Sequence, residues 1–217
     1  MKLLVIGSTG RTGRLVLEQG IRRGHQITAF TRRPEALAGF EGLAGVVAGD
    51  ALNLADLRQA VPGHDAVITI VSPPNLGPTT VISQTTLNLI TVMKESGVRR
   101  VVTTSSRSIV ASRPWLAVTL AWVVFRAAYA DLARAEGMLQ VSGLDWSIVR
   151  ATMLHDKPGS GRVHIDSEPN PTGGHWQLSR ADYAMTLLNV VEDPHMIGHA
   201  IGVNGPHSTR RRRLVWA

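Results

Sequence analysis

The chain begins MKLLVIGSTGRTGRLVLEQGIRRGH (residues 1–25), which joins an apolar run, a glycine-rich turn and an amphipathic segment. The apolar run at residues 3–6 is typical of a buried strand, and the spacing of apolar side chains over residues 12–23 predicts a helix that ends near Gly24. A strand that leads through a short turn into a helix is the first half of a βαβ unit. This stretch therefore predicts an α/β fold.

The turn is GSTGRTG, Gly7–Gly13, with the spacing G-x-x-G-x-x-G. In such a turn Gly7 allows the chain to reverse tightly, Gly10 allows a pyrophosphate to approach the backbone, and Gly13 allows the helix to pack close to the strand. The free N–H groups and the dipole of the helix then attract the anion. The turn predicts a dinucleotide site, and a plain strand-to-helix turn is the alternative that the pattern leaves open.

The alternation of short apolar runs with amphipathic segments continues to residue 150. It predicts a doubly wound parallel sheet of the Rossmann type, because strands that alternate with helices form right-handed βαβ crossovers. Asn53 and Ser179 are at positions where helix N-caps are expected. Asp182 follows Ser179 by three residues, and this spacing is similar to that of a capping box. We expect further strands at residues 26–31, 46–47, 66–71, 101–104, 146–150 and 162–166, and helices at residues 53–61, 79–96, 129–142 and from 179 onward.

The length of 217 residues suits a single domain, residues 1–217, in which residues 107–128 and 155–178 form a small part that covers the substrate. The absence of cysteine excludes disulfides, thiolate nucleophiles and cysteine-based zinc sites, and fits a reducing compartment. The short apolar run after Lys2 does not suit a secretory signal. We therefore expect a cytoplasmic protein.

The formal net charge of +7 includes four charges from the segment Arg210–Arg213. A basic tail of this kind suits contact with nucleic acid or anionic lipid, and a solvated terminus is the simpler interpretation. Elsewhere the sequence has no patch of interleaved basic and aromatic residues. A nucleic-acid partner is therefore not expected.

The most apolar stretch is WLAVTLAWVVF, residues 115–125, bounded by Arg113 and Arg126. It is shorter than the roughly 20 residues that a membrane-spanning helix needs, so we expect no membrane partner. The stretch suits a buried helix, the wall or lid of an apolar pocket, or a subunit contact. Both a monomer and a homodimer are compatible with it.

Arg32 and Arg33 follow the second predicted strand. An acidic side chain at this point would bind the ribose 2′-hydroxyl of NAD, whereas an arginine suits the 2′-phosphate of NADP. The arginines therefore favour NADP(H) over NAD(H), and Arg11 in the first turn is a further candidate for the same clamp. After the third strand, Asp50 suits either the adenine amino group or the backbone N–H groups of the next turn.

The segments GSTGRTG, TRR, GD, PTTVISQTTLNLITVMKESGVRRVVTTSS, SGLDWSIVRATML and SRADYA occur in this order along nearly the whole chain. In this combination the sequence resembles the atypical short-chain dehydrogenases/reductases with NAD(P)H-binding domains. Within that group it is most similar to the flavin reductases, also called biliverdin-IXβ reductases, with NmrA-like redox sensors as more distant relatives.

This resemblance implies roles for residues at the carboxyl ends of the predicted strands. Ser105 and Ser106 become the candidate catalytic residues, as hydrogen-bond donors to a carboxamide or carbonyl. The resemblance places Gly7, Thr9, Gly10, Arg11, Thr12 and Gly13 at the pyrophosphate, Arg32 with Arg33 at the 2′-phosphate, Asp50 and Ala51 at the adenine, Ser72 after the fourth strand, Thr104, Ser105 and Ser106 at the nicotinamide, and Thr152, Met153 and Leu154 on its other side.

The sequence also departs from its relatives. Tyr129 is followed four residues later by Ala133, so the Tyr-x-x-x-Lys pair of familiar short-chain dehydrogenases is absent. Without the lysine a tyrosine is a weak general acid near neutral pH, and a core position is the simpler interpretation of Tyr129. Met153 stands where the flavin reductases carry a histidine, with His155 two positions later, and the loop at residues 72–77 lacks their arginine.

Two other kinds of site find little support. His195 and His199 have the spacing of a helical metal site, but a proline and a glycine beside them disfavour a helix, and we expect no metal. Ser106, His155 and Asp156 lack the nucleophile elbow of a hydrolase.

The sequence thus predicts an NADPH-dependent oxidoreductase that transfers hydride to a flavin, a quinone, a tetrapyrrole or a similar small electron-poor acceptor. The alternative is a non-catalytic NADP(H)-binding redox sensor of the NmrA-like type, which the sparse set of acids and bases favours. A sugar-nucleotide epimerase suits the short chain less well.

Overall fold

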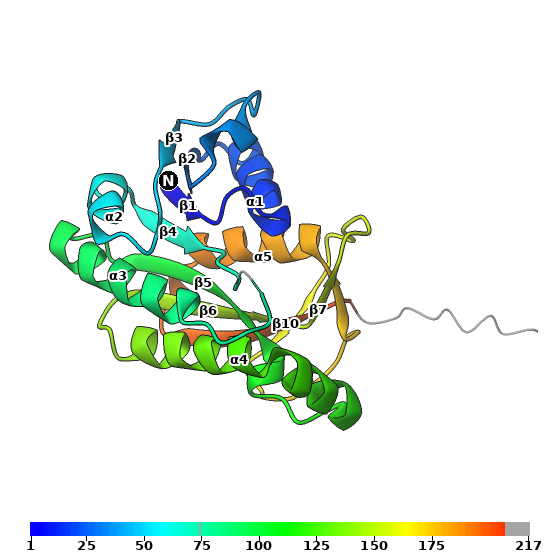
Figure 1. Cartoon of the computed structure of the whole chain (residues 1–217). Helices are drawn as coiled ribbons and strands as arrows, with labels where there is room; N and C mark the ends of the chain where they lie inside the picture. Colours follow the sequence, from blue (N-terminus) through cyan, green and yellow to red (C-terminus); the bar gives the residue numbers. More distant parts are fainter. Residues whose placement is uncertain (74, 207–217) are drawn as a thin grey trace, which may run out of the picture.

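The computed structural model describes residues 1–73 and 75–206, and the basic segment Arg210–Arg213 lies outside these described residues. One eight-stranded sheet runs through the protein with helices on both of its faces (Figure 1). Its strands are β1 (Lys2–Ile6), β2 (Gln26–Thr31), β3 (Gly45–Ala48), β4 (Ala66–Thr69), β5 (Arg100–Ser106), β6 (Asp145–Ala151), β8 (His164–Asp166) and β10 (His199–Asn204). The spatial order is β3-β2-β1-β4-β5-β6-β10-β8, and the neighbours are parallel except for β10 and β8.

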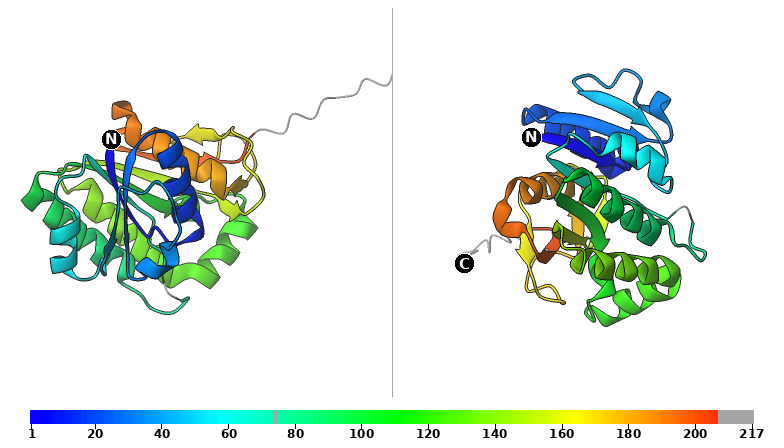
Figure 2. Two further views of the ribbon diagram at one scale, coloured as in Figure 1. Left: turned by 90° about the horizontal axis from the view of Figure 1, so that it is seen from above. Right: turned by 90° about the vertical axis from the view of Figure 1, so that its left-hand side faces the viewer.

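The helices form a layer on each face of this sheet (Figure 2). The short 3₁₀ helices of the described residues are η1 (Pro34–Leu37), η2 (Arg107–Ile109) and η3 (Pro194–Met196). The first face carries α1 (Arg11–Arg22) and α5 (Arg180–Glu192), and the second carries α2 (Leu54–Ala60), α3 (Val81–Ser96) and α4 (Trp115–Gln140).

Successive residues of the central strands alternate between the two helix layers. Leu3 and Val5 pack with α1 and α5, whereas Leu4 and Ile6 pack on the side of α2, α3 and α4. Because both faces are covered, the strand interiors contain continuous apolar runs, such as Leu3–Ile6 and Ala66–Ile68, instead of alternating apolar and polar residues. The predicted doubly wound Rossmann-type sheet is confirmed.

Both predicted N-caps are present in the structure. The side chain of Asn53 accepts a hydrogen bond from the Ala55 N–H at 2.9 Å, at the start of α2. Ser179 accepts one from the Asp182 N–H at 2.9 Å, at the start of α5. Each cap satisfies an amide that has no partner within its helix.

The helix that we expected to begin at residue 129 begins at Trp115 instead. Residues 115–125 and 129–142 belong to one helix, α4, which is kinked at Phe125, where φ is −109° and ψ is 15°. No proline or glycine occurs between residues 115 and 136, so nothing in the sequence ends the first half. Of the interpretations left open for residues 115–125, the buried helix is wrong, because Trp115 is 70% and Val123 is 71% exposed.

The sequence analysis did not predict β10, which lies between β6 and β8. Its sequence, HAIGVN, contains a glycine that weakens the strand pattern. Packing explains the glycine at position 202, because a Cβ atom there would lie 2.0 Å from the Nη1 atom of Arg107.

His195 lies in η3 and His199 is the first residue of β10, so the two histidines do not share a helix.

A second, two-stranded parallel sheet pairs β7 (Met153–His155) with β9 (Gln177–Ser179). Together with η2, β8 and the first half of α4, this small sheet belongs to the segments that we expected to cover a substrate.

Within the described part of the chain, no group of three or more histidine, aspartate or glutamate residues could hold a metal ion. In the same residues, no helix is both long and apolar enough to cross a bilayer.

Candidate functional site

The glycine-rich turn packs against the end of the neighbouring strand β4. Gly7 has φ +82°, and a Cβ atom on it would lie 2.2 Å from the Ile70 carbonyl oxygen. A Cβ atom at Gly13 would lie 2.2 Å from the Gly7 carbonyl oxygen. The nearest atom to a Cβ at Gly10 is that same oxygen, at 3.4 Å. Gly7 and Gly13 are therefore required by the fold, whereas the backbone of Gly10 borders open space.

Helix α1 begins at this turn without a cap. Its N-cap, Gly10, provides no side-chain hydrogen bond, and the first turn contains no acidic residue. Helix α3, which also follows a cavity-lining loop, receives the buried carboxylate of Asp131, which accepts from the Ile82 N–H at 2.8 Å. The first-turn amides of α1 are therefore available to an anion, which the helix dipole would further stabilise.

A cavity of about 290 Å³ adjoins this turn at the carboxyl ends of β1, β2, β3 and β4. Two arginines line it, and neither the Arg32 nor the Arg33 guanidinium has an ion-pair or hydrogen-bond partner among residues 1–73 and 75–206. Ser8 fixes the turn to β2 by donating from Oγ to the Phe30 carbonyl at 3.0 Å. The cavity lining comprises Ile6, Gly7, Thr9, Gly10, Phe30, Thr31, Arg32, Arg33, Gly49, Asp50, Ala51, Leu52, Ile70, Val71, Ser72, Val81 and Thr85.

Asp50 lines the same cavity and also stabilises the turn that follows β3. Its Oδ1 atom accepts a hydrogen bond from the Leu52 N–H at 3.0 Å, while its own N–H donates to Asp56 at 2.8 Å. The turn-capping interpretation of Asp50 is therefore observed. The side chain keeps a second oxygen that can meet an adenine amino group in the cavity.

Arg11 does not lie with Arg32. Its guanidinium pairs with Asp156 at 2.8 Å, and Asp156 also pairs with Arg180 at 2.6 Å. Both Arg11 and Asp156 are more than half exposed, so this contact is weak by itself. It joins the glycine-rich turn to the segment that follows β7, and Arg11 does not line the first cavity.

A second cavity, of about 480 Å³, lies beyond the end of β5. Ser106 lines it, and its Oγ atom accepts a hydrogen bond from the Ser108 N–H at 3.3 Å. Trp122 donates to the Ser108 carbonyl at 2.8 Å and stacks edge-on against Tyr129 at 5.3 Å between ring centroids. The lining contains no charged side chain and comprises Ser106, Ser108, Leu120, Ala121, Val124, Phe125, Tyr129, Thr152, Met153 and Trp176.

The predicted site residues thus divide among two cavities and their surroundings. Thr104 donates to the Thr69 carbonyl at 3.3 Å, and the buried Oγ atom of Ser105 has no hydrogen-bond partner in the described residues. The first cavity receives Gly7, Thr9, Gly10, Arg32, Arg33, Asp50, Ala51 and Ser72; the second receives Ser106, Thr152 and Met153; Arg11, Thr12, Gly13, Thr104, Ser105 and Leu154 line neither.

Several lining residues were not singled out as site residues from the sequence. Phe30, Val81 and Thr85 in the first cavity belong to ordinary strand and helix patterns, which gave no signal. For the second cavity the apolar run at residues 115–125 was a signal. Its interpretation as the wall of an apolar pocket agrees with the structure, in which Leu120 and Val124 line that cavity. Tyr129 is buried, as expected of a core tyrosine, and also borders this cavity, whereas His155 does not.

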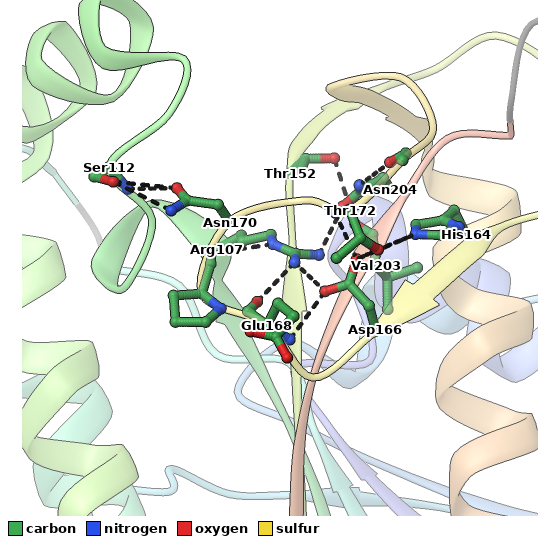
Figure 3. A network of polar contacts seen from close by, with 12 residues as sticks. Arg107, Ser112, Thr152, His164, Asp166, Glu168, Asn170, Thr172, Val203 and Asn204 are labelled. Atoms are coloured by element: carbon green, nitrogen blue, oxygen red, sulfur yellow. Dashed lines mark hydrogen bonds and ion pairs between the residues drawn. The ribbon is translucent and has the colours of Figure 1, made fainter.

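A buried arginine, which lies between the cavity-lining residues Ser106 and Ser108, is held by a network of polar contacts (Figure 3). Arg107, the residue after Ser106, is fully buried and forms an ion pair with Asp166. It also donates to Asn204 Oδ1 at 2.9 Å and to the Glu168 carbonyl at 2.7 Å. These contacts tie the loop after β8 to the ends of β5 and β10.

The pKa of the Asp166 carboxyl reflects this network. Burial by itself raises that pKa, but hydrogen bonds from Arg107 and Thr172 outweigh burial and hold it below its ordinary value. Burial also raises the pKa of Tyr183, whose hydroxyl donates to the Val149 carbonyl at 2.7 Å. Tyr183 is therefore a structural residue and not a proton donor at neutral pH.

Residues 7–194 of the chain match the family of NAD(P)H-binding proteins. The chain belongs to the NAD(P)H-binding family. This membership agrees with the glycine-rich turn and the first cavity, and it confirms the resemblance that the sequence motifs indicated.

Two curated relatives are reductases or dehydrogenases by name. The chain is 28% identical over 231 residues to divinyl chlorophyllide a 8-vinyl-reductase, chloroplastic, of Arabidopsis thaliana, with 95% of this chain and 54% of that protein covered. It is 31% identical over 121 residues to 3-beta-hydroxysteroid dehydrogenase of Mycolicibacterium neoaurum, with 50% and 33% covered. The chain therefore spans about half the length of the first relative and one third of the second.

Solved structures share the fold over nearly the whole chain. A Rossmann-fold NAD(P)-binding family protein from Shigella flexneri is 25% identical with a TM-score of 0.73, covering 94% of this chain and 93% of that one. ChuY, an anaerobilin reductase from Escherichia coli O157:H7, is 20% identical with a TM-score of 0.80, covering 95% and 98%. A short-chain dehydrogenase/reductase from Veillonella parvula in complex with NADP is 18% identical with a TM-score of 0.80, covering 94% of each chain.

Proposed function

We propose that this protein is an NADPH-dependent reductase that passes a hydride to an uncharged, planar, electron-poor group. The observation that carries the proposal is the pair of cavities along the carboxyl edge of one sheet. The first contains an uncapped helix N-terminus and two unpaired arginines, and the second is apolar and without charge. The first suits a phosphorylated dinucleotide and the second a hydrophobic acceptor.

The preference for NADPH over NADH rests on Arg32 and Arg33. Both guanidiniums border the cavity at the end of β2, and no acidic side chain occupies the position that would bind a ribose 2′-hydroxyl. A 2′-phosphate placed there would gain charge-assisted hydrogen bonds from a guanidinium that has no other partner. NADH would leave both cations unpaired.

The dinucleotide, when bound, supplies the hydride. The chain supplies position and environment: Ser106 presents a hydroxyl to the second cavity, and its Oγ atom is oriented by the Ser108 N–H. The neighbouring Ser105 holds an unpaired buried oxygen. The Ser106 hydroxyl, which reaches the second cavity, is our candidate for stabilising the negative charge that develops on the reduced group. Because Ala133 stands four residues after Tyr129, we infer that the final proton comes from solvent.

A flavin, a quinone and a tetrapyrrole each offer such an electron-poor ring system. The names of two relatives, the divinyl chlorophyllide reductase and the anaerobilin reductase, point to tetrapyrrole-type acceptors and make these the first compounds to test. The absence of charge from the lining of the second cavity indicates that the part bound there is the neutral ring.

The test follows NADPH oxidation with FMN, a soluble quinone and a tetrapyrrole as acceptors, together with NADPH and NADH binding by calorimetry. We expect turnover with at least one acceptor, and its rate to fall about 100-fold in Ser106→Ala. Arg32→Ala should weaken NADPH binding roughly tenfold and leave NADH binding nearly unchanged. Arg22→Ala, which removes a surface arginine paired with Glu18, is the matched control.

The same measurements separate the reductase from a redox sensor. Tight NADPH binding without turnover of any acceptor would replace the proposal by the sensor, which the missing Tyr-x-x-x-Lys pair favours. Equal affinity for NADPH and NADH would contradict the role assigned to Arg32.

A further inference from the structure

The first half of α4 presents apolar side chains to solvent. Trp115 is 70%, Leu116 is 65% and Val123 is 71% exposed. With Leu120, Val124 and Phe125 they form a continuous surface that we call the α4 apolar face, and this half of the helix projects at the lower right of Figure 1. An exposed apolar surface of this kind on one helix marks a contact site.

The charges around the α4 apolar face are mainly positive. Arg113 and Arg126 are exposed at its two ends. The acidic residues of α4 do not reach solvent, because Asp131 is fully buried at the start of α3 and Glu136 is buried in an ion pair with Arg150. The loop bonded to Ser112 and Arg113 through Asn170 contributes one exposed carboxylate, Glu168. An apolar helix face with arginines at both ends suits an anionic lipid surface.

The α4 apolar face is continuous with the second cavity. Leu120, Val124 and Phe125 contribute to both, and Met153 on the cavity rim is 54% exposed. A molecule dissolved in lipid could therefore pass from that surface into the cavity along apolar side chains only. No side chain that lines this route within the cavity carries a charge.

We propose that the α4 apolar face docks on the surface of an anionic bilayer and that the acceptor is an uncharged molecule that partitions into lipid. The second clause rests on the proposed reductase function, and the first does not. Apolar helices of this type sink roughly 5–10 Å into the headgroup region, which matches a surface contact and not a span. A second copy suits the face less well, because an antiparallel pairing of the two helices would bring Arg113 of each copy towards Arg126 of the other.

The experiment measures sedimentation of the NADPH-bound protein with vesicles of phosphatidylcholine alone and of an equal mixture with phosphatidylglycerol. We expect binding to the anionic vesicles that weakens as salt is added. The double variant Leu116→Glu/Val123→Glu changes exposed side chains that do not line the second cavity, and should bind these vesicles at least about tenfold more weakly. Val141→Glu, at a side chain 85% exposed beyond the end of α4, is the matched control and should bind normally.

NADPH affinity is measured on the same samples, and all variants should retain it. Reduction of a long-chain quinone held in vesicles should fall in the double variant, while reduction of a short-chain soluble quinone should not. Failure of the wild-type protein to bind anionic vesicles, or equal binding by the double variant, overturns the docking proposal. A wild-type dimer that the double variant converts to a monomer, without vesicle binding, assigns the face to a second copy. Turnover of neither a quinone nor a tetrapyrrole, with vesicle binding intact, counts against the reductase and the lipid-borne acceptor and leaves the docking in place.

Discussion

At the scale of single residues, the glycine-rich turn separates structural from functional demands. Gly7 and Gly13 are enclosed by backbone atoms of the turn and of the segment after β4, so any side chain there collides with the fold. Gly10 has room for a methyl group in the free protein, and its φ of −69° is ordinary for alanine. A pyrophosphate close to the backbone, as we propose, would account for the absence of a side chain at Gly10.

This difference predicts opposite outcomes for two alanine substitutions. Gly13→Ala should destabilise the protein by about 2 kcal/mol or more, because its Cβ atom would lie 2.2 Å from a carbonyl oxygen. Gly10→Ala should change the free energy of unfolding by less than about 1 kcal/mol and weaken NADPH binding at least tenfold. Urea denaturation and calorimetry measure the two effects. Unchanged NADPH affinity in Gly10→Ala would show that the pyrophosphate does not approach this residue.

At the scale of elements, the contact between β5 and the loop after β8 depends on one ion pair. Arg107 is fully buried and the Asp166 side chain is 9% exposed, so the loss of the carboxylate leaves a buried guanidinium without its charged partner. The hydrogen bonds to Asn204 and Glu168 fix the guanidinium in one position. The position of the Arg107 side chain, between two residues that line the second cavity, therefore depends on the charge of Asp166.

The lowered pKa of Asp166 predicts how this contact responds to acid. Its folded-state pKa lies below the unfolded value of about 3.9, so the carboxylate stabilises the fold fully above that value. This stability is lost as the pH falls through the folded-state pKa. We expect Asp166→Asn to reduce the free energy of unfolding by about 3 kcal/mol at pH 7, and the difference from wild type to shrink below about pH 4.

Urea denaturation of both proteins across this pH range measures the difference. Asp156→Asn removes an exposed carboxylate that is also paired with arginines, and should cost less than about 1 kcal/mol at any pH. If Asp166→Asn is as mild as this control, the buried network does not hold the loop.

At the scale of the whole molecule, the first cavity lies where the strand order reverses. β1 leads to β2 and β3 on one side, and β4 leads to β5 and β6 on the other, so the turn after β1 stands beside the end of β4. A dinucleotide bound across this point would contact both halves of the sheet. Binding should therefore stabilise the whole domain and not one half.

This arrangement predicts a single, larger unfolding transition in the presence of NADPH. At about 100 times its Kd, a ligand that binds only the folded state adds about 2.7 kcal/mol, which corresponds to a rise in Tm of roughly 5–10 °C for a chain of this length. NADH at the same concentration should give a smaller rise, since it lacks the phosphate that Arg32 would bind. Scanning calorimetry checks this, and a split transition with NADPH would show that only one half is stabilised.

The sequence predicted most of the first half of the sheet because each signal there is local. The turn at Gly7–Gly13 and the caps at Asn53 and Ser179 involve residues a few positions apart. β10 was missed because Gly202, which weakens its pattern, is explained only by Arg107 nearly a hundred residues earlier. The sequence left open whether the first half of α4 is buried or exposed, because an apolar sequence does not reveal whether a neighbour covers it.

What the sequence determined by itself is the α/β order, the glycine-rich turn and the charge at the end of β2, because each depends on neighbouring residues. Only the tertiary structure decided that Ser106 and Tyr129 border one cavity, that Arg11 lies with Asp156, and that the α4 apolar face stays exposed. Those facts depend on which distant segments meet at the carboxyl edge of the sheet, and strand order and helix packing fix that meeting only once the whole chain has folded.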